Sequence, residues 1–328
     1  MEQQLPTTAR AVHLDHYGPP TLVEQRDVGV PVPAPDGVVV RVHAAGVNRG
    51  DALAIEGIPY AARLSYGVTR PRNPVPGTDV SGVVVAVGSQ VTSFVPGDRV
   101  FGWARGAFAE YAAAASSDLV PTPEGLTFEE AAATPTAAVT ALQGLRLGNV
   151  GAGQHVLVLG ASGGVGSFAV QLAKALGAEV TGVCSTRNVD LVRSLGADHV
   201  VDHTVGDPTA AQRRHDVVLD LAGRRPLSVA RRTVKRGGTY AVIGGGTPRS
   251  LTGMGRFLAA YALSPFGPER LRPVFATPDR DDLETVTQWL ATGEVRPVVE
   301  AAYDLRDAAD AIDFVHRGQA RGKVVLLP

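Results

Sequence analysis

Residues 156–170 read Val-Leu-Val-Leu-Gly-Ala-Ser-Gly-Gly-Val-Gly-Ser-Phe-Ala-Val, an apolar run that enters a glycine-rich turn and then a helical pattern. Glycines let a backbone turn tightly and approach a pyrophosphate, and a helix N-terminus offers N–H groups and a positive dipole to that anion. Because strand, turn and helix stand in the expected order, the stretch predicts a dinucleotide-binding unit rather than a turn without a ligand. We expect the phosphates to contact Ser162, Gly163, Gly164 and Val165.

Strands and helices alternate on both sides of this turn. A helix is expected from Thr127 through about Gly144, and helices at Gly164–Leu176 and Val189–Leu195 follow. Alternation of this kind predicts a parallel sheet with helices on both faces. The strands expected are His155–Leu159, Glu179–Cys184, His199–Asp202, Asp216–Leu221, Thr239–Ile243 and Val274–Ala276.

The end of the second strand indicates which dinucleotide binds. An NAD site usually has Asp or Glu there, whereas this chain has Cys184-Ser-Thr-Arg187-Asn. Arg187 and the Ser185 hydroxyl can pair with a 2′-phosphate, and His203 after the third strand can reach the same group. We therefore expect NADPH, the alternative being a solvated arginine and a surface histidine.

Two further loops follow predicted strands. Leu219-Asp-Leu-Ala-Gly and Val242-Ile-Gly-Gly-Gly lie at the carboxyl ends of the fourth and fifth strands, where ligands bind in such sheets. Ala222, Gly244 and Gly245 are therefore candidates to line the ribose and nicotinamide, although glycine after a strand often serves only a turn.

Composition excludes several classes of protein. The chain has 328 residues, 45% hydrophobic and 19% charged, with a net charge of -1, which is typical of a globular protein. No basic stripe indicates nucleic acid, and no apolar run has the length of a membrane span. The single cysteine, Cys184, forms no intramolecular disulfide. Without a signal-peptide pattern at the N-terminus, we expect a soluble cytoplasmic protein.

The order of motifs resembles that of the medium-chain dehydrogenase/reductase superfamily along nearly the whole chain. The motifs are Val42-His-Ala-Ala-Gly-Val-Asn-Arg-Gly-Asp51, Pro76-Gly-Thr-Asp-Val-Ser-Gly82, Pro96-Gly-Asp-Arg-Val100, Ala109-Glu-Tyr111, Thr140-Ala-Leu142, the glycine turn and Gly322-Lys-Val-Val325. The resemblance implies an α/β fold, with a Rossmann-type doubly wound parallel sheet inserted in a GroES-like, mainly-β catalytic domain. It places the catalytic domain at residues 1–126 and 279–328 and the cofactor domain at 127–278. It also implies that Thr140 and Lys323 help hold the cofactor and that the protein is a homodimer.

Two departures from the zinc enzymes of this superfamily point to its zinc-free, quinone oxidoreductase branch. Asn48 and Thr78 stand where those enzymes have their cysteine and histidine ligands, and Cys184 belongs to a predicted strand of the cofactor domain. A catalytic zinc needs three well-placed Cys, His or Glu ligands, so no metal is expected.

Without a Lewis acid, reduction of a quinone or an α,β-unsaturated carbonyl is easier than oxidation of an alcohol. The cofactor supplies the hydride, and a protein donor stabilises the charge that develops on the substrate oxygen. The resemblance places Asn48 where nicotinamide and substrate meet in the family, which makes it the first candidate donor, and Tyr60 is the second, as donor or proton source. The alternatives are a turn hydrogen bond for Asn48 and a packed or exposed loop residue for Tyr60.

Other functions remain open at this stage. An enoyl-thioester or biosynthetic ene reductase fits if the arginines of residues 57–74 bind a phosphate-bearing carrier, although a solvated loop is the plainer interpretation. A cofactor-binding regulatory protein with little turnover would also keep the glycine turn, but it would not need Asn48 and Tyr60.

Overall fold

The computed structural model describes residues 5–208, 214–244 and 252–328. The chain forms two compact units. The first comprises Met1–Thr136, Pro278–Ala291 and Pro297–Pro328, and the second comprises Ala137–Thr277 and Thr292–Arg296. The first unit therefore continues past the boundary expected after residue 126. The reason is that helix α3 (Phe128–Ala132) packs on the catalytic-domain strands, where Ala132 and Ala133 share a buried cluster with Ala44 and Val325.

The second unit contains a six-stranded parallel sheet in the order β10-β9-β8-β11-β12-β13, which confirms the Rossmann-type prediction. The strand order reverses between β8 and β11, and such a switch point is where doubly wound sheets bind ligands. The strands are β8 (His155–Leu159), β9 (Glu179–Cys184), β10 (His199–Asp202), β11 (His215–Asp220), β12 (Val234–Val242) and β13 (Arg270–Pro273).

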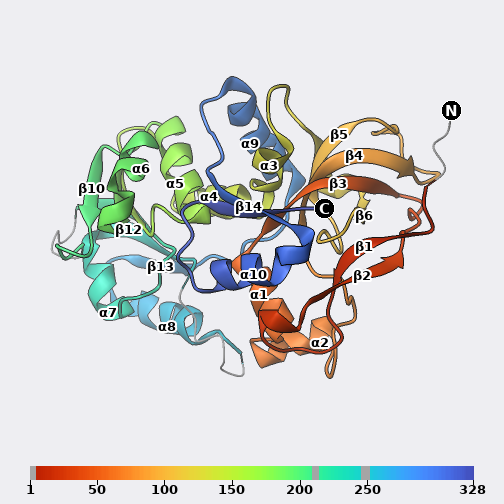
Figure 1. The fold of residues 1–328 in the computed structure, drawn as a ribbon. Coiled ribbons are helices and arrows are strands. Elements are labelled where there is room, and N and C mark those ends of the chain that lie inside the picture. The colour runs from red at the N-terminus through yellow and green to blue at the C-terminus, as the bar shows by residue number, and fades with distance from the viewer. Residues whose placement is uncertain (1–4, 209–213, 245–251) are drawn as a thin grey trace. The chain divides into compact units, whose positions relative to one another are not determined.

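Helices cover both faces of this sheet (Figure 1). On one face lie α4 (Pro135–Leu147), α5 (Gly164–Ala175) and α6 (Val189–Ser194), and on the other lie α7 (Leu227–Ala230) and α8 (Gly255–Leu263). The core beneath the second pair includes fully buried Tyr240 and Leu271. Short 3-10 turns complete the unit at Thr186–Asn188, Arg231–Thr233 and Ser264–Phe266.

Two predicted elements of this region were wrong. The single helix expected from Thr127 to Gly144 is two helices, because Pro135 has no N–H to continue the first and begins the second. Thr127 is the expected N-cap, since its hydroxyl accepts from the Glu130 N–H at 3.1 Å. The sixth strand is β13 rather than Val274–Ala276, with Leu271 buried between exposed arginines.

The first unit is mainly β. Its seven-stranded sheet has the order β14-β15-β3-β4-β5-β7, with β6 also paired to β3, and β1 and β2 form a separate antiparallel pair. The mainly-β prediction is therefore confirmed. The strands are β1 (Thr8–His13), β2 (Glu24–Gly29), β3 (Gly37–Val47), β4 (Asp79–Val87), β5 (Arg99–Trp103), β6 (Tyr111–Ala115), β7 (Leu119–Pro121), β14 (Val299–Asp304) and β15 (Lys323–Leu327).

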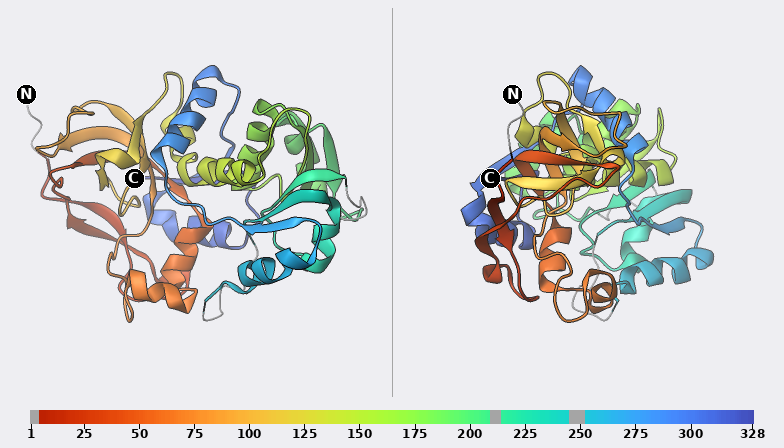
Figure 2. Two further views of the ribbon diagram at one scale, coloured as in Figure 1. Left: turned by 180° about the vertical axis from the view of Figure 1, so that it is seen from behind. Right: turned by 90° about the vertical axis from the view of Figure 1, so that its right-hand side faces the viewer.

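The end of the chain completes this unit. Strand β15 pairs antiparallel with β3, and α10 (Ala308–His316) lies beside α1 (Arg49–Glu56), as Figure 2 shows in blue and orange. Both helices bury an apolar side in one core, which includes Ile55 and Ile312. The remaining helices are α2 (Arg63–Tyr66), α9 (Arg280–Thr292) and the 3-10 turns Pro20–Leu22, Tyr60–Ala62, Ser116–Asp118 and Leu305–Asp307.

Candidate functional site

The glycine turn joins β8 to α5 in the second unit. Gly160 turns the chain at a φ of 92°, in the region that favours glycine. A Cβ on Gly166 would lie 2.1 Å from the Gly160 carbonyl oxygen, so only glycine allows this approach of helix to strand. Helix α5 begins at Gly164, and the N–H groups of its first turn have no intrahelical acceptors. The turn therefore leaves N–H groups that a dinucleotide phosphate would accept from, and binding of that phosphate stays a prediction.

Asn188, in the 3-10 turn after β9 (Thr186–Asn188), is a residue that the sequence did not single out. It is 5% exposed, and its Nδ2 donates to the hydroxyls of Ser162 at 2.9 Å and Ser185 at 3.4 Å. Its Oδ1 is buried with no hydrogen-bond partner among the described residues. Asn188 thus links two of the predicted cofactor residues, and its orphaned oxygen suits a ligand donor such as a ribose hydroxyl.

The residues proposed for a 2′-phosphate gather where β9 and β10 end. Ser185 precedes the 3-10 turn that carries exposed Arg187, and the His203 N–H donates to the Cys184 carbonyl at 3.0 Å. Asp202 lies beside them, and its Oδ1 accepts from the Thr204 N–H at 2.8 Å and the Thr204 hydroxyl at 2.7 Å. Hydrogen bonds from Thr186 and Thr204 lower the pKa of Asp202, so this carboxylate is charged.

The other predicted cofactor residues of this unit lie on three elements. A Cβ on Gly160 would be 3.5 Å from the Ala222 nitrogen, and one on Gly244 would be 2.1 Å from the Leu221 carbonyl oxygen. The loops after β8, β11 and β12 therefore pack closely at the carboxyl ends of the strands. Thr140, on α4, is 8% exposed. Gly245 lies outside the described residues.

Asn48 belongs to a hydrogen-bonded group in the first unit. It precedes α1, and its backbone N–H donates to Asp51 Oδ2 at 2.8 Å. Its side-chain Nδ2 donates to Asp79 Oδ2 at 2.9 Å, and its Oδ1 accepts from the Lys323 ammonium. One N–H of the Asn48 amide has no acceptor within this group.

Asp79 is held from its other side by α4. Its Oδ1 accepts from the Thr136 hydroxyl at 2.5 Å and its Oδ2 from the Thr136 N–H at 3.3 Å. Trp103 Nε1 donates in turn to the Thr136 hydroxyl at 3.2 Å. The Asp79 carboxylate therefore accepts from three groups, the Thr136 hydroxyl, the Thr136 N–H and the Asn48 amide, and lies 3.8 Å from the Lys323 ammonium.

The charges of this group are buried. Asp51 is 6% exposed, Asp79 0% and Lys323 4%. Burial, together with the charge of Asp79, raises the pKa of Asp51 to about 7. Burial also raises the pKa of Asp79, against the effect of Lys323, and lowers the pKa of Lys323, against the effect of both carboxylates. Among these residues the sequence singled out Asn48 and Lys323, but not their contact.

Lys323 was predicted to help hold the cofactor. Its ammonium donates to the Val47 carbonyl at 3.3 Å and to Asn48 Oδ1, and lies 3.8 Å from Asp79 Oδ2. These contacts occupy the ammonium inside the first unit, and direct contact with the cofactor stays a prediction.

Tyr60 is 47% exposed and lies on the loop after α1. The guanidinium of Arg63 lies 5.2 Å from its ring centre and 4.6 Å from that of Tyr17. Arg63 Nε also donates to the Gly57 carbonyl at 2.8 Å. Arg63 therefore stabilises the 57–74 loop, which makes it a poor candidate to bind an acidic substrate group.

Neither a metal site nor a membrane span is found in the described residues. Across residues 5–208, 214–244 and 252–328, no three His, Cys, Asp or Glu side chains are grouped so as to hold a metal ion. Over the same ranges, no helix is both long enough and apolar enough to cross a membrane.

The chain is similar to known oxidoreductases along most of its length. Residues 34–124 match the alcohol dehydrogenase GroES-like domain, and residues 195–326 match the zinc-binding dehydrogenase family. The chloroplast envelope quinone oxidoreductase homolog of Arabidopsis thaliana is 33% identical, over 93% of this chain and 94% of that protein.

One further relative and one solved structure are also oxidoreductases. The chloroplastic NADPH-dependent alkenal/one oxidoreductase of Arabidopsis thaliana is 33% identical, over 97% of this chain and 78% of that protein. Among solved structures, the quinone oxidoreductase from Coxiella burnetii is 27% identical with a TM-score of 0.85, covering 98% of this chain and 99% of its own.

Proposed function

Because the chain belongs to the quinone oxidoreductase-like branch of the medium-chain dehydrogenase/reductase superfamily, whose members are NAD(P)H-dependent oxidoreductases, we propose that it uses NADPH to reduce a quinone or an α,β-unsaturated carbonyl compound without a metal. The observation that carries the proposal is the Asn48 amide, which is oriented by two buried charged groups and keeps one N–H for a ligand.

The residues of the chain have separate tasks in this proposal. When bound, NADPH would supply a hydride to the electron-poor carbon of the substrate, and the negative charge that develops on the substrate carbonyl oxygen would be neutralised by a proton from Tyr60 or from solvent. The remaining Asn48 N–H donates to that oxygen, and it is worth most where the charge is largest. Tyr60, which is 47% exposed, is the second candidate donor.

The cofactor is held by the second unit. The α5 N-terminus with Ser162, Gly163, Gly164 and Val165 binds the pyrophosphate, and Asn188 aligns the two serines. Ser185, Arg187 and His203 bind the 2′-phosphate. The charged Asp202 carboxylate repels the same phosphate, so we expect only a moderate preference for NADPH over NADH.

The names of the relatives support the substrate class but not the location, since two of them are chloroplast proteins. The proposed substrate is a small molecule, and the proposed compartment is the cytoplasm. The proposed assembly is a homodimer in which the edge strand β13 pairs with its symmetry copy.

An enoyl-thioester reductase is the second candidate within enzymes. It is favoured less because Arg63, one of the arginines that would bind a phosphate-bearing carrier, is held by Tyr17, Tyr60 and the Gly57 carbonyl. A regulatory cofactor-binding protein is favoured less because it would not require the oriented Asn48 amide.

Fluorescence titration with NADPH and NADH tests the cofactor assignment. We expect NADPH to bind more tightly, Arg187→Ala to remove about 1.5–3 kcal/mol of that difference, and Asp202→Asn to increase it. Tighter binding of NADH would refute the assignment.

Turnover tests the reaction. We expect NADPH oxidation with 1,4-benzoquinone and 3-buten-2-one to be faster than with crotonyl-CoA. Asn48→Ala lowers kcat by roughly a hundredfold, the effect typical of losing one oxyanion donor, with cofactor affinity unchanged. Crotonyl-CoA as the best substrate would favour the thioester reductase, and no turnover with any of the three would favour the regulatory protein.

A further inference from the structure

We propose that Lys323 and Asp79 are positioning residues that fix the orientation of the Asn48 amide, so that one defined N–H is presented to the substrate oxygen. The inference rests on the proposed function of Asn48 and assigns to the buried lysine a role in the reaction rather than in holding the cofactor.

The Asn48 amide has a charged partner at its oxygen and another at its nitrogen. Lys323 has only donors and Asp79, as a carboxylate, only acceptors. The ammonium donates to Asn48 Oδ1, and Asn48 Nδ2 donates to Asp79 Oδ2 at 2.9 Å. An amide rotated by 180° would set its NH2 against the ammonium and its oxygen against the carboxylate, and would lose both contacts. Only one orientation is therefore stable.

Burial strengthens the preference for this one orientation of the Asn48 amide. Lys323 and Asp79 are 4% and 0% exposed, so water does not replace either contact. A charged group that loses its partner at such depth is strongly destabilised. The lysine is further anchored by the Val47 carbonyl at 3.3 Å and the aspartate by Thr136, so neither can follow a rotating amide.

The strand register brings the three residues together. Val324 on β15 lies opposite Val47 on β3, and Gly46 on β3 lies opposite Asp79 on β4. Lys323, at the start of β15, therefore meets Asn48, at the end of β3, although they are 275 residues apart in the chain. A site held by three paired strands is more rigid than one on loops.

A double-mutant cycle tests the coupling. The chain has three lysines, and Lys235→Met is the control because Lys235 pairs with Asp216 in the second unit. We expect Lys323→Met to lower kcat roughly tenfold or more without changing the NADPH dissociation constant, and Lys235→Met to leave kcat unchanged. In the Asn48→Ala background, Lys323→Met should have no further effect on kcat. An equal loss in both backgrounds would overturn the proposal.

Removing both charges separates positioning from stability. In Lys323→Met/Asp79→Asn the Asp79 charge no longer lies buried without its lysine, so thermal stability should recover in part relative to Lys323→Met. Since Asn48 Oδ1 still lacks its donor, kcat should stay low. Recovery of kcat to the wild-type value in this double variant would overturn the proposal.

A spectroscopic measurement is independent of turnover. The chain has four asparagines, so 15N-asparagine labelling gives four side-chain amide groups, and Asn48→Ala assigns one of them. We expect the Asn48 N–H signals to move or broaden in Lys323→Met and to stay in place in Lys235→Met. Unchanged Asn48 signals in Lys323→Met would refute the positioning. Absence of quinone or enone reduction by the wild-type protein would refute only the proposed function.

Discussion

At the residue scale, Gly166 shows how one missing side chain permits a binding turn. Its absent Cβ leaves room for the Gly160 carbonyl, and the other atoms that a Cβ would meet, Ala161 C and Cα at 2.9 Å, are also backbone and cannot rotate away. We expect Gly166→Ala to destabilise the protein by about 1–3 kcal/mol and to weaken NADPH binding. Urea unfolding and fluorescence titration measure the two effects.

Gly151→Ala is the matched control, because a Cβ there would meet no atom within 4 Å. Its stability and NADPH affinity should remain at wild-type values. If Gly166→Ala behaved like Gly151→Ala, the close approach of α5 to β8 would not be needed for binding.

The buried Asp51 carboxyl makes stability depend on pH. Burial and the neighbouring Asp79 raise its pKa to about 7 in the folded protein, against about 3.9 when unfolded. The folded state therefore binds the extra proton. The stability this provides is complete below about pH 4 and is lost as pH rises to about 7, by up to roughly 4 kcal/mol.

Asp51→Asn removes this dependence while its amide oxygen can still accept from the Asn48 N–H. We expect the free energy of unfolding in urea to fall less between about pH 5 and pH 8 in Asp51→Asn than in the wild type. Asp36→Asn, at an exposed position, is the control and should keep the wild-type slope. An unchanged slope in Asp51→Asn would assign the pH dependence to other groups.

Residue types and spacing predicted the glycine turn and the 2′-phosphate candidates, and the resemblance to a family predicted Asn48. They could not identify the contact between Lys323 and Asn48, because it depends on the pairing of β15 with β3 across 275 residues. Asn188 had a local signal, since it stands three residues after Ser185 at the end of β9, but its bond to Ser162 depends on the tertiary fold.

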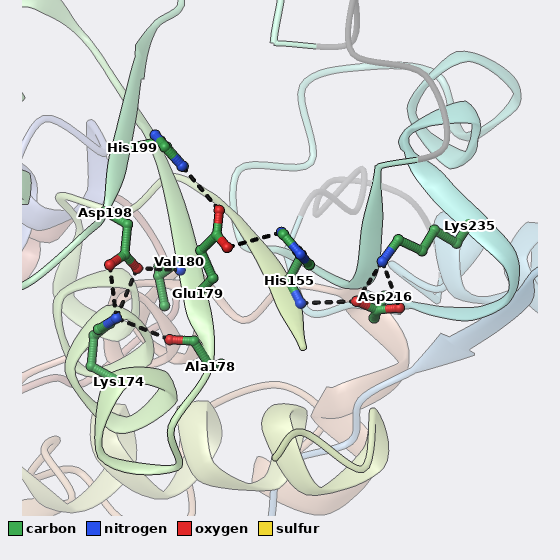
Figure 3. A network of polar contacts seen from close by, with 9 residues as sticks. All are labelled: His155, Lys174, Ala178, Glu179, Val180, Asp198, His199, Asp216 and Lys235. Atoms are coloured by element: carbon green, nitrogen blue, oxygen red, sulfur yellow. Dashed lines mark hydrogen bonds and ion pairs between the residues drawn. The ribbon is translucent and has the colours of Figure 1, made fainter. Parts of the chain in front are cut away.

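At the scale of elements, ion pairs line the amino ends of the parallel strands in the second unit (Figure 3). Asp198 accepts from the Val180 N–H at 2.7 Å and from Lys174 at 2.8 Å, and Asp216 accepts from the His155 N–H at 2.9 Å. Partial burial opposes ionisation of Asp198, but the bonds from Lys174 and Val180 lower its pKa overall. These two aspartates satisfy strand N–H groups, whereas Glu179 bridges only exposed histidine rings.

This difference predicts unequal effects of two substitutions. Asp198→Ala leaves a strand N–H and a lysine without their acceptor and should cost about 1–3 kcal/mol. Glu179→Ala removes only solvent-exposed contacts with His155 and His199 and should cost about 1 kcal/mol or less. Urea unfolding of both variants measures the two effects, and a Glu179→Ala loss as large as that of Asp198→Ala would contradict this reasoning.

Elements were predicted well where apolar runs were continuous and poorly where they were not. β8 and β9 have the predicted bounds. β13 was misplaced because Arg270 and Arg272 flank its buried Leu271, so the segment has no apolar run. Pro135 signalled the break between α3 and α4, but the surrounding alanines favoured the prediction of one continuous helix.

At the scale of the whole molecule, the sheet of the first unit depends on the last residues of the chain. β15 lies between β14 and β3, and its Val324, Val325 and Leu326 are each 0% exposed. Only the resemblance to a family indicated that the chain returns to its first domain here.

Deleting residues 320–328 should therefore unfold the first unit. Burial of an aliphatic side chain contributes about 1.5–3 kcal/mol, so the loss of three such residues is comparable with a total stability of roughly 5–15 kcal/mol. The deletion also leaves β3 and β14 without their shared partner and removes the anchor of Asn48. We expect a large fall in melting temperature by circular dichroism and early proteolysis within residues 5–136. Deleting Pro328 alone is the control and should have little effect, and a 320–328 deletion that melts with the full-length chain would show that β15 does not stabilise the sheet.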